Sequence, residues 1–394
     1  MEGYNFNAKR PVETYHKSDI LFFISVVFLW GLGLFTLSCC SQHYGLSMFG
    51  DPFHFVKRQL IYSAIGAVAF ALFMFMNMNF IRRMLPLMVF ATALLCAGTF
   101  VPGIRVELNG ASRWIKMPFS FLFQPSELVK FTLVLYFANF FRKWHETELE
   151  EDKSVLPCVG LFIFFLVLIF AQQDLSTPLF IACIGILMFF VSGTKIVWIF
   201  PVLLLAVPAG VLMISLNEYR LKRIIGFIKP EENLSTINYQ SIASRRAISA
   251  GGIWGDGIGI GLDRLRNIPE IQSDYIFAGW VEAMGFVGFL VYIAALLFFA
   301  WRGYRTAMRC PDRFSAYASF GCVSVIFFQS LMNIMVVGGL LPATGIPLPF
   351  FSQGGSSMIV TLAMCGFVLN ASRCEENNEN YSKDVEINID TFGM

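Results

Sequence analysis

The residues whose types could do chemistry lie between Tyr239 and Gly288, a stretch that begins polar, basic and glycine-rich and ends as an apolar run. One aspartate, Asp274, stands at the threshold of that run. A positioned carboxylate can act as a general base and accelerate a reaction by about 10²–10⁴-fold. Aspartate before an apolar helical run is also a common helix N-cap. Spacing alone favours the cap, so both interpretations remain open at this point.

Basic side chains crowd the polar part of this stretch and the residues before it. They are Arg220, Lys222, Arg223, Lys229, Arg245, Arg246, Arg264 and Arg266. Arginine forks bind phosphate oxygens in pairs, which predicts capture of a pyrophosphate; attraction to anionic lipid headgroups is the alternative. The glycines from Gly251 to Gly261 permit sharp turns and close approach of a ligand. They do not form a GxGxxG turn after a strand, which excludes a Rossmann-type nucleotide site.

A second polar cluster lies near residues 110–130. Glu127 and Lys130 follow a proline–serine helix start and, three residues apart, share one helix face. Ionisable groups inside a membrane span are costly and usually face a polar interior. The pair is therefore either part of a functional site or an ion pair that braces two helices. Arg113, beside Trp114, is either an interfacial anchor or a contact for an anion.

Two further segments place polar or irregular residues where an apolar frame does not need them. Asp174, in the sequence QQDLSTP, is either a helix cap or part of the polar lining of a cavity mouth. Residues 333–357 combine glycines with Pro342, Pro347 and Pro349, which predicts a broken, re-entrant segment. Irregular backbone at membrane depth persists only when it is buried in protein or lines a watery cavity. We interpret this segment as the wall of a pocket, with a tight packing loop as the alternative.

The elements that must position these residues are membrane-spanning helices. The chain has 394 residues, of which 56% are hydrophobic and only 14% charged, so a water-soluble core could not hide its apolar surface. We therefore expect an all-α integral membrane protein. Because a spanning helix needs about 20 mostly apolar residues, about ten spans are predicted. They cover 19–40, 59–78, 84–103, 126–142, 155–172, 178–194, 196–216, 276–300, 315–338 and 356–372.

The distribution of positive charge predicts the orientation. Loops expected to be cytoplasmic hold Arg82, Arg83, Arg142, Lys143, Lys153, Lys195, Arg302, Arg305, Arg309 and Arg313. Residues 1–18 are then a cytoplasmic tail, residues 19–373 a transmembrane domain, and residues 374–394 a polar cytoplasmic tail predicted to be disordered. The large loop 217–275, between the seventh and eighth spans, falls outside the cytoplasm. The first span lacks a cleavage site and is interpreted as retained.

Other classes of function find no support in the composition. The net charge of +2 and the absence of a basic tail or zinc spacing argue against binding of nucleic acid. The four histidines are scattered, so no histidine-based metal site is visible. The nine cysteines mostly fall in apolar runs and are interpreted as buried small hydrophobic residues.

At these residues the chain resembles the SEDS family (shape, elongation, division and sporulation) of ten-span peptidoglycan glycosyltransferases. The matching motifs are GASRWI, FQPSELVK, QDLST, the YQS…AISAGGIWGDGIG stretch, IPEIQSDYIFAGWVEAMGFVG and NIMVVGGLLPATGIPLPFFSQGGSS. The resemblance covers roughly residues 19–373. The last motif and CPDRF at 310–314 resemble the FtsW-like division branch more than the RodA-like elongation branch.

The chain departs from the family pattern at a few positions. Gln272 and Ser273 stand where a His–Thr pair is usual before the aspartate, and Gln353 stands where tyrosine is usual. A single Glu282, followed by alanine, replaces two consecutive glutamates, and Gln173 replaces proline. These departures put the fine positioning of the site in doubt, but not the class of reaction.

The resemblance implies the substrate and the chemistry. Lipid II, a disaccharide-pentapeptide on undecaprenyl pyrophosphate, is polymerised by joining the acceptor GlcNAc 4-hydroxyl to the donor MurNAc anomeric carbon. This favours Asp274 as the catalytic base over the cap. Glu282, eight residues on, is expected to share its helix face. Residues expected to bind or support the substrate are Arg113, Glu127, Lys130, Arg245, Arg246 and Glu282. A divalent cation, magnesium or manganese, is allowed, but no ligand set demands it.

The resemblance also implies a location and partners. We expect a multi-pass protein of the bacterial cytoplasmic (inner) membrane that works with a class B penicillin-binding protein and other division or elongation proteins. A transporter of lipid-linked precursors, a flippase, is the alternative, because many spans and buried ions are also features of transporters. A scaffold that recruits other wall enzymes is compatible with either.

Overall fold

The computed structural model describes residues 18–108, 111–117, 121–146, 154–194, 239–257 and 271–373, with scattered positions between 197 and 228. The main helices are α1 (Ile20–Cys40), α3 (His54–Phe75), α4 (Met78–Gly98), α5 (Pro125–Glu146), α6 (Leu156–Ala171), α7 (Ser176–Val191), α12 (Ile276–Arg309), α13 (Arg313–Val337) and α14 (Gly355–Ala371). Each of them coincides with a predicted span. The remaining prediction, 196–216, is described only at scattered positions, and the predicted tails lie outside the described residues except for residue 18.

Within the described residues, α1, α3, α4, α12 and α13 are long and apolar enough to cross a membrane, and α6, α7 and α14 are shorter apolar helices. The chain is thus a multi-pass helical membrane protein, as predicted. The most apolar window of α13 is 61% buried, whereas that of α3 is 17% buried. Because both helices are apolar, this difference marks α13 as a central helix and α3 as one that faces lipid.

The centre of the bundle is formed by α5, α13 and α14, with α3 packed along α14 and α12 along α13. Aromatic rings fill the space between α5 and its neighbours. Phe137 packs edge-on against Phe162 of α6 and Phe189 of α7, with ring centroids 5.2 and 5.8 Å away. These perpendicular contacts suit the quadrupoles of the rings. The many phenylalanines of the sequence therefore form the packed core as well as the lipid-facing surface.

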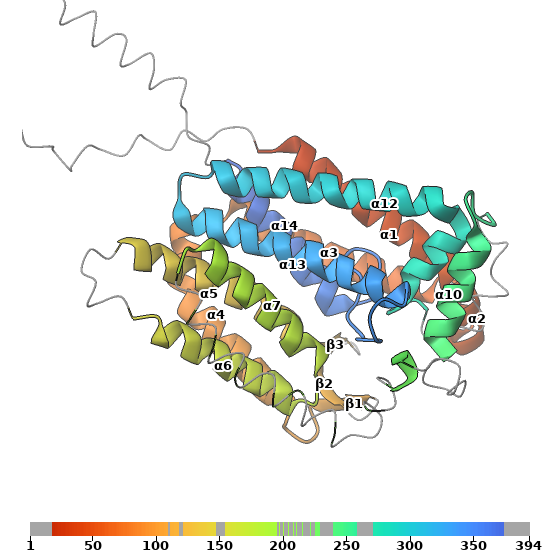
Figure 1. Cartoon of the computed structure of the whole chain (residues 1–394), viewed down its shortest axis with the longest axis horizontal. Helices are drawn as coiled ribbons and strands as arrows, with labels where there is room; N and C mark the ends of the chain where they lie inside the picture. The colour runs from red at the N-terminus through yellow and green to blue at the C-terminus, as the bar shows by residue number, and fades with distance from the viewer. Residues whose placement is uncertain are drawn as a thin grey trace, which may run out of the picture.

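The two ends of the bundle differ (Figure 1). At one end the first and last helices meet, since the backbone N–H of Asp19 donates to Oγ of Ser372 at 3.0 Å, and Arg302 lies 2.7 Å from the carboxylate of Asp19. Arg82 and Asp312 pair at 3.5 Å at the same end. The opposite end carries α10 (Tyr239–Gly251), α2 (Gln42–Phe49) and a small sheet. The arginines predicted to be cytoplasmic thus gather at the end away from Asp274.

Three elements were not predicted. The loop at 41–58 contains α2, and residues 104–125 form an antiparallel sheet of β1 (Arg105–Leu108), β2 (Ala111–Lys116) and β3 (Leu122–Phe123) in that order. The strands are short and irregular, with a register shift at Val106 and Glu107, so their alternation is too brief to detect in the sequence. In the large loop, residues 239–251 form the helix α10 rather than irregular structure.

Helix α12 extends to Arg309, beyond its predicted end, and is interrupted at Gly285, whose φ of 63° and ψ of −161° are not helical. Residues 252–257 pair with this break through backbone hydrogen bonds. Asp256 donates to the carbonyl of Glu282 at 3.0 Å, and Phe286 donates to the carbonyl of Gly252 at 2.9 Å. Groups freed by the interrupted helix are thereby satisfied within the protein, as membrane depth requires.

A pair of glycines in α1 tests how closely this helix packs on the segment before α14. A methyl group at Gly33 would overlap the carbonyl of Phe350, whereas a methyl group at Gly31 would meet no atom within 4 Å. Overpacking costs about 1–3 kcal/mol, while alanine is otherwise the better helix former. We expect Gly33→Ala to lower the thermal unfolding temperature of the purified protein and Gly31→Ala not to lower it. Equal unfolding temperatures for the two variants would contradict the packing.

Candidate active site

The segment between α13 and α14, residues 338–354, is called here the re-entrant segment. It has no regular structure over 342–348, and it turns into the bundle, because Leu348 and Phe351 are 1% and 0% exposed. The prediction of an irregular segment buried in protein is therefore confirmed. Its position brings it against residues 272–274, which precede α12.

Three consecutive carbonyl groups before α12 accept hydrogen bonds from this region. The carbonyl of Gln272 accepts from the backbone N–H of Gln353 at 2.8 Å, and that of Ser273 accepts from Oγ of Ser352. The carbonyl of Asp274 accepts from Nδ2 of Asn333 on α13 at 3.1 Å. Because every peptide in a row is fixed, the backbone that carries Asp274 has little freedom to move.

Asp274 itself is half-buried and lies at the end of the bundle opposite the arginine-rich end. The N-cap of α12 is Tyr275, so Asp274 stands one residue before the cap position. The side chain faces the re-entrant segment: a methyl group added to Gly345 would lie 3.7 Å from Oδ2 of Asp274. The structure thus places this half-buried carboxylate beside the exposed backbone of Gly345 in the re-entrant segment.

A line of polar side chains on α13 joins the re-entrant segment to α5. Asn333 donates to the carbonyl of Ile346 at 2.9 Å, and Gln329, one turn earlier, donates to the carbonyl of Pro347 at 2.9 Å. Oε1 of Gln329 accepts from Nζ of Lys130 at 2.7 Å. Two amides at helical spacing therefore connect Lys130 to the segment that holds Asp274.

Glu127 and Lys130 form the ion pair that their spacing predicts. The two charged groups lie 2.8 Å apart, and the residues are 4% and 3% exposed. Within this part of the chain the pair is enclosed by protein, which agrees with the bracing interpretation. Its link through Gln329 also makes it a support of the re-entrant segment.

Arg113, on β2, lies on the far side of this network with Asp174. Its Nε is 3.6 Å from Oδ2 of Asp174, and its guanidinium donates to the carbonyl of Gln173 at 3.4 Å. Asp174 is 1% exposed and also accepts hydrogen bonds from the backbone N–H and the hydroxyl of Thr177, at 3.2 and 2.7 Å. Asp174 stands one residue before Leu175, the N-cap of α7, and bonds the first turn through Thr177; the sequence did not reveal its pairing with Arg113.

The two neighbouring arginines of α10 occupy different surroundings. Arg245 is half-buried and lies against the re-entrant segment, where a methyl group at Gly339 would overlap its guanidinium. Within the described residues, Nε of Arg245 has no hydrogen-bond partner. Arg246 is exposed. The predicted contacts Arg264 and Arg266 lie outside the described residues.

Glu282 does not share a helix face with Asp274, because Asp274 precedes the helix. It is 1% exposed and lies near Cys40 of α1 and against Gly251 of α10. The glycines were expected to allow close approach of a ligand. At Gly251 and Gly255 it is the backbone of α12 that approaches closely. Gly259 and Gly261 lie outside the described residues.

Comparison with known proteins decides the family. The model of the FtsW, RodA and SpoVE family, described as “Cell cycle protein”, matches residues 20–377. The chain belongs to this family. The probable peptidoglycan glycosyltransferase FtsW of Trichlorobacter lovleyi is 33% identical over 90% of this chain and 93% of that protein. Stage V sporulation protein E of Bacillus subtilis is 32% identical over 90% of this chain and 97% of that protein.

Solved structures agree with this assignment. The chain aligns with a chain of the structure reported as “Structural coordination of polymerization and crosslinking by a peptidoglycan synthase complex”, with a TM-score of 0.71, 26% identity and coverage of 90% of this chain and 98% of that one. It has the fold of Thermus thermophilus rod shape determining protein RodA, with a TM-score of 0.67 at 24% identity over 92% and 99% of the chains. The predicted family and its FtsW-like branch are thus confirmed.

Within this FtsW-like chain, two departures from the family pattern lie against each other. Gln272 and Gln353 are joined by the backbone hydrogen bond described above, and Gln272 is 5% exposed. Both changes fall on one of the three hydrogen bonds that hold residues 272–274. The positioning of Asp274 that these departures put in doubt therefore depends on this single contact. Among the described residues, no group of three or more His, Cys, Asp or Glu side chains could hold a metal ion.

The buried ion pair of α5 predicts an uneven response to substitution. Lys130→Met leaves the Glu127 carboxylate buried beside an apolar side chain, which should cost about 3–5 kcal/mol of stability. Adding Glu127→Gln removes the stranded charge, so the double variant should regain part of the loss. Thermal unfolding of the two single variants and the double variant in detergent measures this. If the double variant is as unstable as the sum of the single variants, the pairing is refuted.

Proposed function

We propose that this chain is a peptidoglycan glycosyltransferase that polymerises lipid II into glycan strands and releases undecaprenyl pyrophosphate, in septal wall synthesis during cell division. This reaction is supported by FtsW relatives, each of which this chain matches over more than nine-tenths of the relative's length. The observation on which we base the site is that the backbone of Asp274 is fixed by three successive hydrogen bonds while its carboxylate is only half-buried.

In the proposed reaction, Asp274 takes the proton from the 4-hydroxyl of the acceptor GlcNAc as the oxygen attacks the anomeric carbon of the donor MurNAc. A base contributes only when it is held within hydrogen-bond reach of the proton. The hydrogen bonds that fix the backbone of residues 272–274 favour such a fixed position for the carboxylate. Gln329 and Asn333 act as positioning residues, and the pair Glu127–Lys130 supports them from α5. Glu282 supports the packing of α10 on α12.

The departing diphosphate needs positive charge. Arg245 suits this role, since its guanidinium lies against the re-entrant segment that also faces Asp274. Arg113 would bind a sugar or phosphate oxygen with the donors that Asp174 and Gln173 leave available, and Arg246 would contribute from the exposed face of α10. A magnesium or manganese ion held by the diphosphate oxygens would add to this charge. The described side chains form no ligand set for such an ion, so no step is assigned to it.

We further propose that the Asp274 end faces outward and that both chain ends lie in the cytoplasm of a bacterial cell, because the arginine-rich end of the bundle fits the positive-inside rule. A class B penicillin-binding protein and other division proteins would then meet the outer end and the spans. The FtsW-like sequence and the match to a peptidoglycan synthase complex support such a partner. Co-purification of the two proteins tests it, and absence of any complex would count against it.

Asp274→Asn separates a base from a structural residue. Asparagine keeps the size and polarity of the side chain but cannot accept the proton, so polymerisation should fall by about 10²–10⁴-fold while the protein stays folded. The assay uses purified protein and labelled lipid II in detergent, with thermal unfolding as the control for folding. Near-normal polymerisation by Asp274→Asn would end the assignment of the base. If the wild-type protein forms no glycan chains in detergent but moves lipid II across vesicle membranes, the transporter alternative replaces the enzyme.

The two arginines of α10 form a matched pair of variants. Arg245→Gln removes a charge next to the re-entrant segment, and should lower kcat/KM for lipid II by about tenfold or more, as expected for loss of a charge-assisted hydrogen bond. Arg246→Gln removes the same charge from an exposed position one residue away and should have a smaller effect. A larger loss for Arg246→Gln would reverse the proposed roles.

A further inference from the structure

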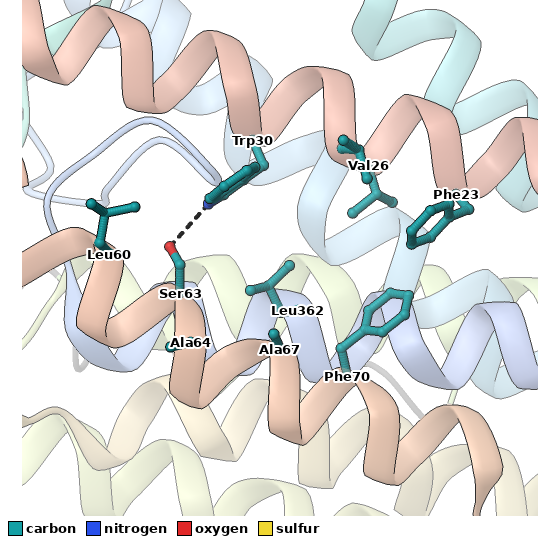
Figure 2. Close-up of a pocket in the computed structure, with 10 residues that line it drawn as sticks. Phe23, Val26, Trp30, Leu60, Ser63, Ala64, Ala67, Phe70 and Leu362 are labelled. Carbon is teal, nitrogen blue, oxygen red and sulfur yellow. Dashed lines mark hydrogen bonds between the residues drawn. The ribbon is translucent and has the colours of Figure 1, made fainter.

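A cavity of about 410 Å³ lies between α1 and α3, with α14 behind it (Figure 2). Its lining is almost wholly apolar: Phe23, Val26, Val27, Trp30, Leu60, Ser63, Ala64, Ala67, Phe70 and Leu362. This volume falls within the range of small-ligand sites, about 300–1,000 Å³. None of these lining residues belongs to the polar network of Asp274, and nothing in the proposed chemistry has used the cavity.

The cavity is closed at both ends along the helix axes (Figure 2). At one end Nε1 of Trp30 donates a hydrogen bond to Oγ of Ser63 at 2.9 Å. At the other end the rings of Phe23 and Phe70 contact each other, with centroids 6.0 Å apart. Between these two contacts the small side chains Ala64 and Ala67 leave the space open.

The side of the cavity opens towards lipid. Val27 and Leu60 are each 44% exposed on helices that cross the membrane, so hydrocarbon rather than water meets this opening. From Phe23 to Trp30 the helix rises only about 10 Å, which is shorter than a spanning helix of about 30 Å. A partner helix would need a continuous groove, so a flexible hydrocarbon chain entering from the side is the occupant that fits.

One end of the cavity adjoins the proposed active site. Gln59, next to Leu60, donates from Nε2 to the carbonyl of Ser352 at 3.2 Å, and Ser352 holds the carbonyl of Ser273. On α1, Gly33 lies one turn beyond Trp30 and packs against Phe350. The end marked by Trp30 and Ser63 is thus one helical turn from the re-entrant segment.

The depth of the cavity favours a chain longer than one leaflet. Measured along α1 from Cys40, the cavity extends from about 15 Å at Trp30 to about 26 Å at Phe23. An acyl chain from the outer leaflet ends near the middle of a hydrocarbon core of about 30 Å, and so reaches only the first edge. A chain from either leaflet must enter through the lipid-facing side, because the Trp30–Ser63 and Phe23–Phe70 contacts close the two ends. A polyprenyl chain anchored at the Asp274 end is long enough to fill the whole cavity.

We propose that the cavity between α1 and α3 binds part of the polyprenyl chain of the lipid-linked substrate, with its diphosphate at the Asp274 end. This inference rests on the proposed function, because it takes its ligand from that reaction. The cavity then acts as a binding site for the chain, and would distinguish long polyprenyl substrates from short ones.

Photolabelling tests the proposal with the full-length protein in lipid nanodiscs. The probe is undecaprenyl diphosphate with a diazirine midway along its chain, in the part that the depth of the cavity selects, and labelled peptides are located by mass spectrometry. We expect label on the α1 and α3 residues that line the cavity. Unlabelled undecaprenyl diphosphate should displace it, and geranylgeranyl diphosphate, whose shorter chain reaches only the first edge of the cavity, should displace it far less. A phospholipid with a diazirine at the end of its acyl chain is the comparison.

Variants at adjacent positions make the result specific. Ala67→Trp fills the cavity, whereas Val68→Trp adds the same ring at a lipid-facing position, 61% exposed, that does not line it. Labelling of the cavity should fall at least about fivefold in the first variant and stay unchanged in the second. Ala64→Leu is a second, smaller filling variant, and thermal unfolding identifies any variant that has lost its fold.

Several outcomes would overturn the proposal. The first is label on helices other than α1 and α3. The second is an equal loss of labelling in Ala67→Trp and Val68→Trp. The third is equal labelling of the cavity by the phospholipid probe, with no displacement of that probe by undecaprenyl diphosphate. Labelling needs binding but no turnover. A protein that is labelled in the cavity yet does not polymerise lipid II would therefore refute the proposed reaction and leave the binding site standing.

Discussion

The structure depends on the need to satisfy irregular backbone at membrane depth. The re-entrant segment has no helical hydrogen bonds of its own over much of its length, and its buried peptides would be costly if left unpaired. They are paired with the residues before α12 and with the amides of α13. The same bonds that make the segment possible hold Asp274 in place, so folding and the geometry of the candidate site have one cause.

This constraint explains why polar residues occur inside an apolar bundle. Gln329 and Asn333 lie in the central helix, where a polar side chain is unfavourable unless it is hydrogen-bonded. Their amides bond to carbonyls of the re-entrant segment, and Gln329 also accepts from Lys130. The charge of Lys130 is in turn balanced by Glu127. A series of hydrogen bonds and one ion pair therefore runs from α5 to the residues before α12. Each buried polar group in the series has the next one as its bonding partner.

Much of this arrangement could be predicted from the sequence, for physical reasons. Long apolar runs require spanning helices, and the prolines and glycines of 333–357 require a broken segment, so both were found. The pairing of Glu127 with Lys130 follows from their spacing on a helix. The contacts of Asn333 with Asp274 and of Arg113 with Asp174 join residues 59 and 61 positions apart, which no local pattern reveals. Gln329 and Asn333, four residues apart in an apolar span, were the available signal for the polar line on α13.

Errors arose where tertiary contact overrides local pattern. The glycine-rich run was interpreted as a place for a ligand, yet Gly251 and Gly255 are occupied by the backbone of α12. The prediction that Glu282 shares a helix face with Asp274 counts two helical turns from a residue that precedes the helix, whose start at Ile276 is the predicted one. The small sheet escaped notice because its strands are short and the residues around them carry no sustained alternation.

The break in α12 at Gly285 has a mechanical consequence. Residues 252–257 are bonded to α12 on both sides of that glycine, to Glu282 and Ala283 before it and to Phe286 and Val287 after it, so they splint the break and tie α10 to both arms of the helix. A force on α10 from outside the bundle is then shared by both arms of α12, and the long inner arm, packed along α1 and α13, resists it.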